Sequence, residues 1–217
     1  MCPHIKLFIP LQAYTIEQMD RFLESIQDVE FDGISMPIRN LSLASLAVFL
    51  TRLYQVGITT VHLLGVGAFF RLAVAAYMAR HFFAWVSVDS TTWKSNATYN
   101  QYADPDDLSI HYLRSGAIID GSITNNCPCP WCKERSLTYI QHLPYQDREL
   151  LLRCHNYWAL NKVMADLYDN AATVVDLIGY LESKSRRVKE IKKLYRALSV
   201  VDALRDTDIG LVEDLLR

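Results

Sequence analysis

The first ninety residues alternate between short apolar segments and segments with helical periodicity. The apolar segments span residues 5–12, 30–37, 59–67 and 83–90, so each begins roughly 24 to 29 residues after the previous one. Strands that alternate with helices at this spacing are typical of βα units on a parallel sheet. We therefore predict an α/β fold with four parallel strands that are covered on both faces.

Four βα units fit either a small doubly wound sheet or half of an eight-stranded βα barrel, because a complete barrel takes about 250 residues. The pattern changes after Asp89. Residues 91–126 are rich in Ser, Thr, Asn, Tyr and Asp and are predicted to be mostly irregular, whereas helical segments follow from residue 145 onward. The predicted regions are four βα units at 1–93, an insertion at 94–160 and a helical region at 161–217.

Charge and cysteine content narrow the class of protein. A formal net charge of −2 gives no overall attraction to nucleic acid, so any such contact requires a local basic patch. No apolar run reaches the roughly 20 residues that span a bilayer, and the N-terminus lacks the order of a signal peptide. Five cysteines, odd in number and mostly clustered, fit a reducing compartment. We expect a cytoplasmic protein with reduced thiols and no membrane partner.

The segment NNCPCPWCKERS, residues 125–136, places Cys127, Cys129 and Cys132 in a C-x-C-x-x-C pattern. A tight loop of this kind brings three thiolates around one point, and Zn²⁺ takes four ligands in a tetrahedron. The downstream candidates for the fourth ligand are His142, Cys154 and His155. His155 is favoured, because a predicted helix would present its imidazole to the loop. The sequence thus predicts one structural Zn²⁺ per chain in a closed site.

Along the chain the segments FIPLQAYT, FDGISM, VHLLGVG and VSVDSTTW precede CPCPWC and CHNYW. Together these segments resemble the tRNA-guanine transglycosylases, in the order in which that family has them. CPCPWC followed by CHNYW is similar to the zinc signature of the family, and VSVDSTTW to the segment that carries its catalytic aspartate. VHLLGVG resembles the strand and turn before the penultimate barrel helix, FIPLQAYT the strand whose glutamine reads the base, and FDGISM the glycine-containing strand beside it. The resemblance covers residues 5 to about 165.

This resemblance implies both a fold and an activity. The fold would be the C-terminal half of a (β/α)8 TIM-like barrel with an inserted zinc-binding subdomain and a helical C-terminus. The activity would be that of a pentosyltransferase of the queuosine and archaeosine type. Such an enzyme exchanges guanine for a 7-deazaguanine base in tRNA, or in DNA as the DNA-modifying relatives do.

The resemblance also assigns roles to individual residues. Asp89, at the end of the fourth strand, matches the nucleophile that attacks the anomeric carbon of the ribose and expels guanine. Gln12 matches the amide that hydrogen-bonds the edge of the base. Gly33 and Gly65 are expected at strand ends where a side chain would crowd a planar ligand, with Leu64 against the face of the base. Without the resemblance, Asp89 would serve as a cap and the glycines as turn residues.

The first half of the family's barrel, which carries a second aspartate and an aromatic that stacks on the base, has no counterpart in this sequence. We therefore expect a homo- or hetero-oligomer that completes the barrel, unless the chain is a truncated remnant. The alternative function is that of a non-catalytic zinc-bearing subunit that docks nucleic acid or a catalytic partner.

Residues 183–197, SKSRRVKEIKKLYRA, contain seven basic side chains and a single acidic one, Glu190. Such a run is either a solvated helix face or a contact to a phosphate backbone. His62 is expected to be a hydrogen-bonded core residue. Core packing or loop anchoring, rather than stacking on bases, is expected for four aromatic residues: Trp85, Trp93, Tyr99 and Tyr102.

Overall fold

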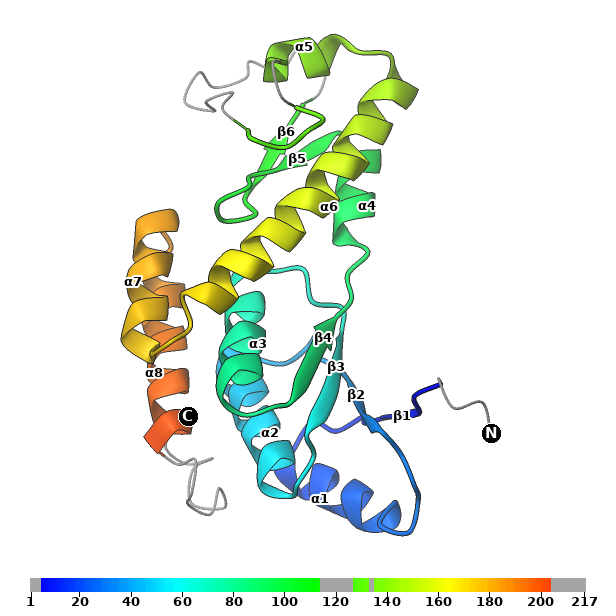
Figure 1. Cartoon of the computed structure of the whole chain (residues 1–217), viewed down its shortest axis with the longest axis vertical. Coiled ribbons are helices and arrows are strands. Elements are labelled where there is room, and N and C mark those ends of the chain that lie inside the picture. Colours follow the sequence, from blue (N-terminus) through cyan, green and yellow to red (C-terminus); the bar gives the residue numbers. More distant parts are fainter. Residues whose placement is uncertain (1–4, 114–126, 133–134, 204–217) are drawn as a thin grey trace. The chain divides into compact units, whose positions relative to one another are not determined.

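The computed structural model describes residues 5–113, 127–132 and 135–203. Its main sheet has four parallel strands in the order β1-β2-β3-β4 (Figure 1). The strands are β1 (Phe8–Pro10), β2 (Gly33–Pro37), β3 (Thr60–Leu64) and β4 (Trp85–Val88). The register pairs Ile34 with Val61, and Val61 with Val86. The predicted α/β fold with a four-stranded parallel sheet is confirmed.

Three helices connect these strands: α1 (Ile16–Ser25), α2 (Leu43–Gln55) and α3 (Phe69–His81). Two of them begin at hydroxyl caps, because Thr15 accepts a hydrogen bond from the backbone N–H of Gln18 and Ser42 accepts one from that of Ser45. Buried residues of α2 recur at three- and four-residue spacing, as Leu46, Leu50 and Leu53 do. Figure 1 shows α2 and α3 together on one side of the sheet.

The two faces of the sheet differ in burial, contrary to the expectation that both are covered. On β3, Val61 and Leu63 are fully buried, whereas Thr60, His62 and Leu64, which point to the other face, are half-buried. His62 is therefore not a core residue, although its Nδ1 lies 2.6 Å from the Ser87 hydroxyl. Trp85, expected to pack in the core or anchor a loop, is 45% exposed.

The C-terminal region is helical, as predicted. Its helices are α6 (Tyr145–Asp169), α7 (Val174–Lys184) and α8 (Val188–Ala203). α7 and α8 pack against each other, and α8 also packs against α2 and α3. The fully buried side chains of Leu177, Leu194 and Leu198 form the apolar face of this pair. Residues 204–217 of the predicted helical region lie outside the described residues.

The prediction of a mostly irregular segment after Asp89 is wrong for its first part. Residues 91–113 form α4 (Thr92–Thr98) and an antiparallel hairpin of β5 (Gln101–Ala103) and β6 (Ile110–Tyr112). These elements are short and polar, and Asn100 and Leu108 adopt positive φ at turns, so the local pattern gives no periodic signal. A further short helix, α5, spans Leu137–His142. Residues 114–126 lie outside the described part.

The chain divides into two compact units. The sheet unit contains the described residues up to Ser90 together with residues 167–203. The hairpin unit contains the described residues from Thr91 to Asp166, and therefore most of α6.

Candidate metal centre

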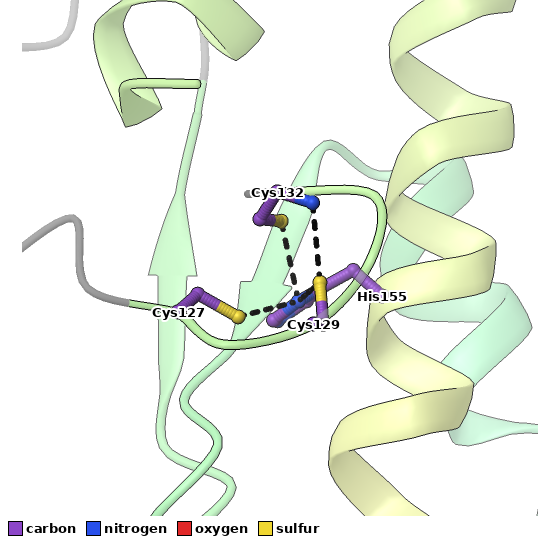
Figure 2. A group of neighbouring side chains, drawn as sticks. All are labelled: Cys127, Cys129, Cys132 and His155. Atoms are coloured by element: carbon purple, nitrogen blue, oxygen red, sulfur yellow. Dashed lines mark hydrogen bonds between the residues drawn. The ribbon is translucent and has the colours of Figure 1, made fainter. Parts of the chain in front are cut away.

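The 127–132 loop and α6 bring four ligand-type side chains of the hairpin unit together. Cys127, Cys129 and Cys132 lie on the loop and His155 on the helix, and their ligand atoms all lie within 4.8 Å of one another (Figure 2). Cys129 and His155 are fully buried, and Cys127 is only 9% exposed. These are the four side chains that the sequence predicts, and the cluster could hold a metal ion.

The distances between these side chains match a tetrahedral site. The Nδ1 atom of His155 lies 3.5 Å from the sulfur of Cys127, 3.4 Å from that of Cys129 and 3.4 Å from that of Cys132. Zinc–sulfur bonds of about 2.3 Å and zinc–nitrogen bonds of about 2.0 Å, at tetrahedral angles, place sulfur and nitrogen about 3.5 Å apart. We therefore interpret the three contacts as edges of a coordination tetrahedron.

The imidazole of His155 is held from two directions. Its Nδ1 faces the sulfurs, which leaves Nε2–H to donate to the Ala103 carbonyl oxygen at 2.8 Å. The ring of Tyr102 stacks on it with centroids 3.9 Å apart and an interplanar angle of 14°. A histidine ligand whose second nitrogen bonds a carbonyl has a fixed tautomer and ring orientation. The β5 strand thus orients the ligand that α6 supplies.

The side chains of the cluster shift one another's pKa values. Hydrogen bonds with Cys127 and Cys129 raise the pKa of Cys132 well above its ordinary value, and those with Cys129 and Cys132 lower the pKa of Cys127. Burial lowers the pKa of His155, but its contacts with Cys127 and Cys129 outweigh that effect and raise it to about 9. A bound cation would favour thiolates and a neutral imidazole, because metal ligands must be deprotonated.

The asparagine next to His155 secures the strand that accepts its hydrogen bond. The Oδ1 atom of Asn156 accepts from the backbone N–H of Ala103 at 2.9 Å, and its Nδ2 donates to the carbonyls of Gln101 and Trp93. Asn156 is 1% exposed and all these partners are backbone groups. Asn156 directly follows His155 in the sequence. The sequence does not reveal its role, because its partners lie more than fifty positions away.

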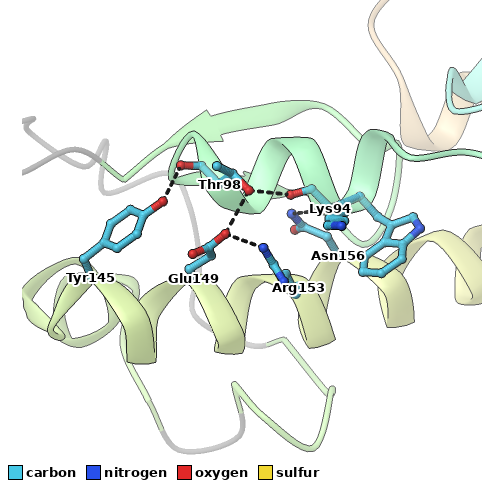
Figure 3. A network of polar contacts seen from close by, with 7 residues as sticks. Lys94, Thr98, Tyr145, Glu149, Arg153 and Asn156 are labelled. Carbon is cyan, nitrogen blue, oxygen red and sulfur yellow. Dashed lines mark hydrogen bonds and ion pairs between the residues drawn. The ribbon is translucent and has the colours of Figure 1, made fainter.

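A second polar network joins α4 to α6 (Figure 3). Glu149 accepts hydrogen bonds from the Thr98 hydroxyl at 2.8 Å and from Arg153 at 2.6 Å. The Thr98 hydroxyl is the main cause of a lowered pKa of Glu149, and Arg153 lowers it further. Tyr145 donates to the Thr98 carbonyl, so two residues of α6, Tyr145 and Glu149, contact the end of α4. The network fixes α4 on the helix that carries His155.

The other candidates for the fourth ligand lie outside the cluster. His142 is exposed, and its Nδ1 contacts the Thr138 carbonyl at 2.7 Å. Cys154 is a half-buried free thiol beside His155 on α6. Successive positions on a helix point about 100° apart, so only one of the two neighbours can face the loop.

Asp89 follows β4, at the edge of the sheet where the strands have their carboxyl ends. Its side chain is exposed, and one oxygen, Oδ1, accepts from the backbone N–H of Gly65 at 2.6 Å. Gly65 directly follows β3 and has φ +80°, a conformation that favours glycine. Leu64 ends β3 and is half-buried. The structure therefore brings Asp89, Leu64 and Gly65 together.

The two remaining predicted site residues are not next to Asp89. Gln12 is exposed two positions after β1, the strand at the opposite end of the sheet from β4. Gly33 was expected to end a strand, but it begins β2 and is therefore at the amino-terminal edge. A Cβ atom on Gly33 would lie 2.7 Å from the Phe8 ring and 2.7 Å from the Thr60 carbonyl. Close packing between neighbouring strands explains this glycine.

Comparison with protein-family models and with curated proteins finds no match for this chain. In the part of the chain that the structure describes, no helix has both the length and the apolar character to cross a membrane.

Proposed function

We propose that this chain is a base-exchange transglycosylase that replaces guanine in a nucleic acid by a 7-deazaguanine base. The observation that carries the proposal is the position of Asp89, an exposed carboxylate directly after β4 and beside the Gly65 turn. Active sites of βα barrels lie at this edge, where strand ends and the following loops meet. The resemblance of VSVDSTTW and VHLLGVG to transglycosylase segments falls on these two strand ends.

The proposed chemistry is a double displacement at the anomeric carbon. A carboxylate oxygen of Asp89 forms a bond to the ribose carbon as the bond to guanine breaks, and guanine leaves with that electron pair and takes up a proton. The incoming base then loses its proton, bonds the same carbon and releases Asp89 as a carboxylate. A carboxylate suits both steps, because it also stabilises the positive charge that develops on the sugar ring.

The cluster of Cys127, Cys129, Cys132 and His155 is proposed to hold one structural Zn²⁺. Thiolate and imidazole ligands suit zinc, and four protein ligands leave no open position for a substrate. The burial of the sulfurs and of His155 supports a structural rather than a catalytic role.

The four-stranded sheet is proposed to be the C-terminal half of a (β/α)8 barrel that an oligomeric partner completes. Within the described residues β1 and β4 each pair with one strand, so the sheet has two edges that could accept further strands. The half-buried face that carries Thr60, His62 and Leu64 would then line the interior of the barrel. The substrate would be tRNA or DNA.

A guanine-exchange assay on the full chain, alone and with a candidate second half barrel, tests the proposal. Asp89→Asn keeps an oxygen that accepts from Gly65, whereas Asp89→Ala removes it, so the pair separates the nucleophile from the bond that holds the turn. We expect both variants to lose activity by about 10⁴-fold or more. Full exchange by Asp89→Asn would refute the assignment.

One contact favours a second candidate, a non-catalytic zinc-bearing subunit. The 2.6 Å bond from Gly65 gives Asp89 a structural role that needs no substrate. In that case neither variant matters to exchange by the assembled protein, and only Asp89→Ala lowers its stability.

A further inference from the structure

A cavity of about 990 Å³ lies within the sheet unit, between α8 and the starts of α2 and α3. Leu41 to Ala44 contribute the wall from α2, and Ala68, Phe70 and Arg71 the wall from α3. Residues between Arg187 and Val200 complete it from α8 and the residue before that helix. A hollow of this volume accommodates a nucleotide-sized group.

Four of the five charged side chains that line the cavity are cations. They are Arg71, Arg187, Lys193 and Arg196, and the fifth is Glu190. Glu190 is paired with Lys193 at 3.2 Å, an exposed pair that contributes little to stability. Among residues 5–113, 127–132 and 135–203, no carboxylate forms an ion pair with Arg187 or Arg196. The cavity is therefore a local positive site in a chain with a net charge of −2.

The tertiary structure separates the basic run of residues 183–197 into two groups. Arg187, just before α8, and Lys193 and Arg196 on α8 line the cavity, whereas Lys189 and Lys192 lie on α8 outside it. Arg71 joins the first group from a distant part of the sequence, and its Nη2 donates to the carbonyls of Arg39 and Leu41 at 2.9 Å each. A merely solvated helix face would not place cations from two segments around one hollow.

Apolar and aromatic surface lies beside these cations. Tyr195 lines the cavity and is 46% exposed, and Leu43, Phe70 and Val200 contribute apolar wall. Cations that follow a phosphate backbone, together with an aromatic face for a base, characterise sites for single-stranded nucleic acid.

The cavity lies at the edge of the sheet that also carries Asp89. The segments that reach its wall, Ile38–Ser42 and Gly65–Ala68, follow the carboxyl ends of β2 and β3. Gly65 donates to Asp89 from the second of these segments. A strand bound in the cavity would thus run along the edge at which the proposed nucleophile is exposed.

We propose that this cavity binds the phosphodiester backbone of a single-stranded stretch of nucleic acid. Arg187 and Arg196 contact phosphates, and Tyr195 stacks on a base. The inference rests on the proposed function, because it states how the sheet unit holds the substrate strand outside the reacting nucleotide.

Fluorescence anisotropy with labelled polyuridine and oligothymidylate over a range of salt concentrations tests the inference. Arg187→Gln/Arg196→Gln removes two charges from the cavity, and Lys189→Gln/Lys192→Gln removes two from the same helix outside it. For the arginine pair we expect weaker binding and a slope of log affinity against log salt that is smaller by about 1.4, which corresponds to two lost phosphate contacts. The lysine pair should bind as the unchanged protein does. Tyr195→Ala should weaken binding without changing the slope.

Equal loss in the arginine and lysine pairs would overturn the inference, since it would show general attraction to α8. Displacement of the oligonucleotide by equimolar inorganic phosphate would also overturn it, in favour of a small phosphate ligand. Neither oligonucleotide contains guanine, so binding is measured independently of base exchange. Arginine-dependent binding without any base exchange would support this inference and contradict the proposed function. Base exchange by a protein whose oligonucleotide binding is unchanged in the arginine pair would support the proposed function and contradict this inference.

Discussion

Different interactions stabilise the interior of the sheet unit and the interior of the hairpin unit. The sheet unit buries long aliphatic side chains completely, among them Leu46, Leu50 and Leu63. Among its described residues the hairpin unit has a buried cluster of ten members, and three of them are the cysteines of the metal centre. A small apolar core supplies little net stability, so units of this kind commonly depend on a metal. The ion proposed for this centre would therefore form part of the core of the hairpin unit.

The largest expected effect is unfolding of the hairpin unit while the sheet unit stays folded. Cys129→Ser removes one of the three sulfurs, and binding of a structural zinc contributes about 10–16 kcal/mol in zinc-finger peptides. We expect elemental analysis to show one zinc per chain before the substitution and none after it. Hydrogen exchange should show lost protection in α4, α5 and most of α6, with α2 and α3 still protected.

Cys154→Ser is the matched control, because this thiol neighbours His155 but lies outside the cluster. It should retain the metal and the protection. A metal-free Cys129→Ser protein with a fully protected hairpin unit would show that this unit does not depend on a metal.

The reciprocal change should weaken the sheet unit and spare the metal. Leu50 on α2 is fully buried, and replacing such a leucine by alanine costs about 2–5 kcal/mol through lost burial and a residual cavity. We expect Leu50→Ala to lower the urea concentration at which α2 and α3 lose their protection from hydrogen exchange. The zinc content should stay unchanged. Leu150→Ala makes the same chemical change at a position that is 64% exposed, and should alter stability by about 0.5 kcal/mol at most. Zinc loss in Leu50→Ala would mean that the stabilities of the two units are coupled.

The smallest of these effects should come from the residue that orients the ligand strand. Asn156→Ala leaves the four ligands intact but frees the strand whose Ala103 carbonyl accepts from His155. Groups that orient a ligand typically contribute 10- to 100-fold in metal affinity, and Asn156 acts through a backbone group, so we expect about a tenfold loss. Competition with a chromophoric chelator measures it. Asn161→Ala, at an exposed position of the same helix, should leave the affinity unchanged. Equal metal affinities of the two variants would show that Asn156 does not contribute to metal binding.

The sequence by itself determined the features that depend on spacing along the chain. Three cysteines within six positions share one loop whatever surrounds them, and a helix that carries His155 can supply only one of its neighbouring side chains. The apolar segments near residues 5, 30, 59 and 83 formed strands because β-branched and aromatic residues favour the extended backbone of a sheet.

The tertiary structure alone decided everything that depends on distant partners. Gly33 is small because Phe8 and Thr60 crowd it, and Ala103 accepts from His155 because Asn156 fixes its strand. The basic run gives no sign of which of its side chains share a cavity with the distant Arg71. Each of these contacts joins residues at least 25 positions apart, and no local pattern of hydrophobicity or charge records such a pairing.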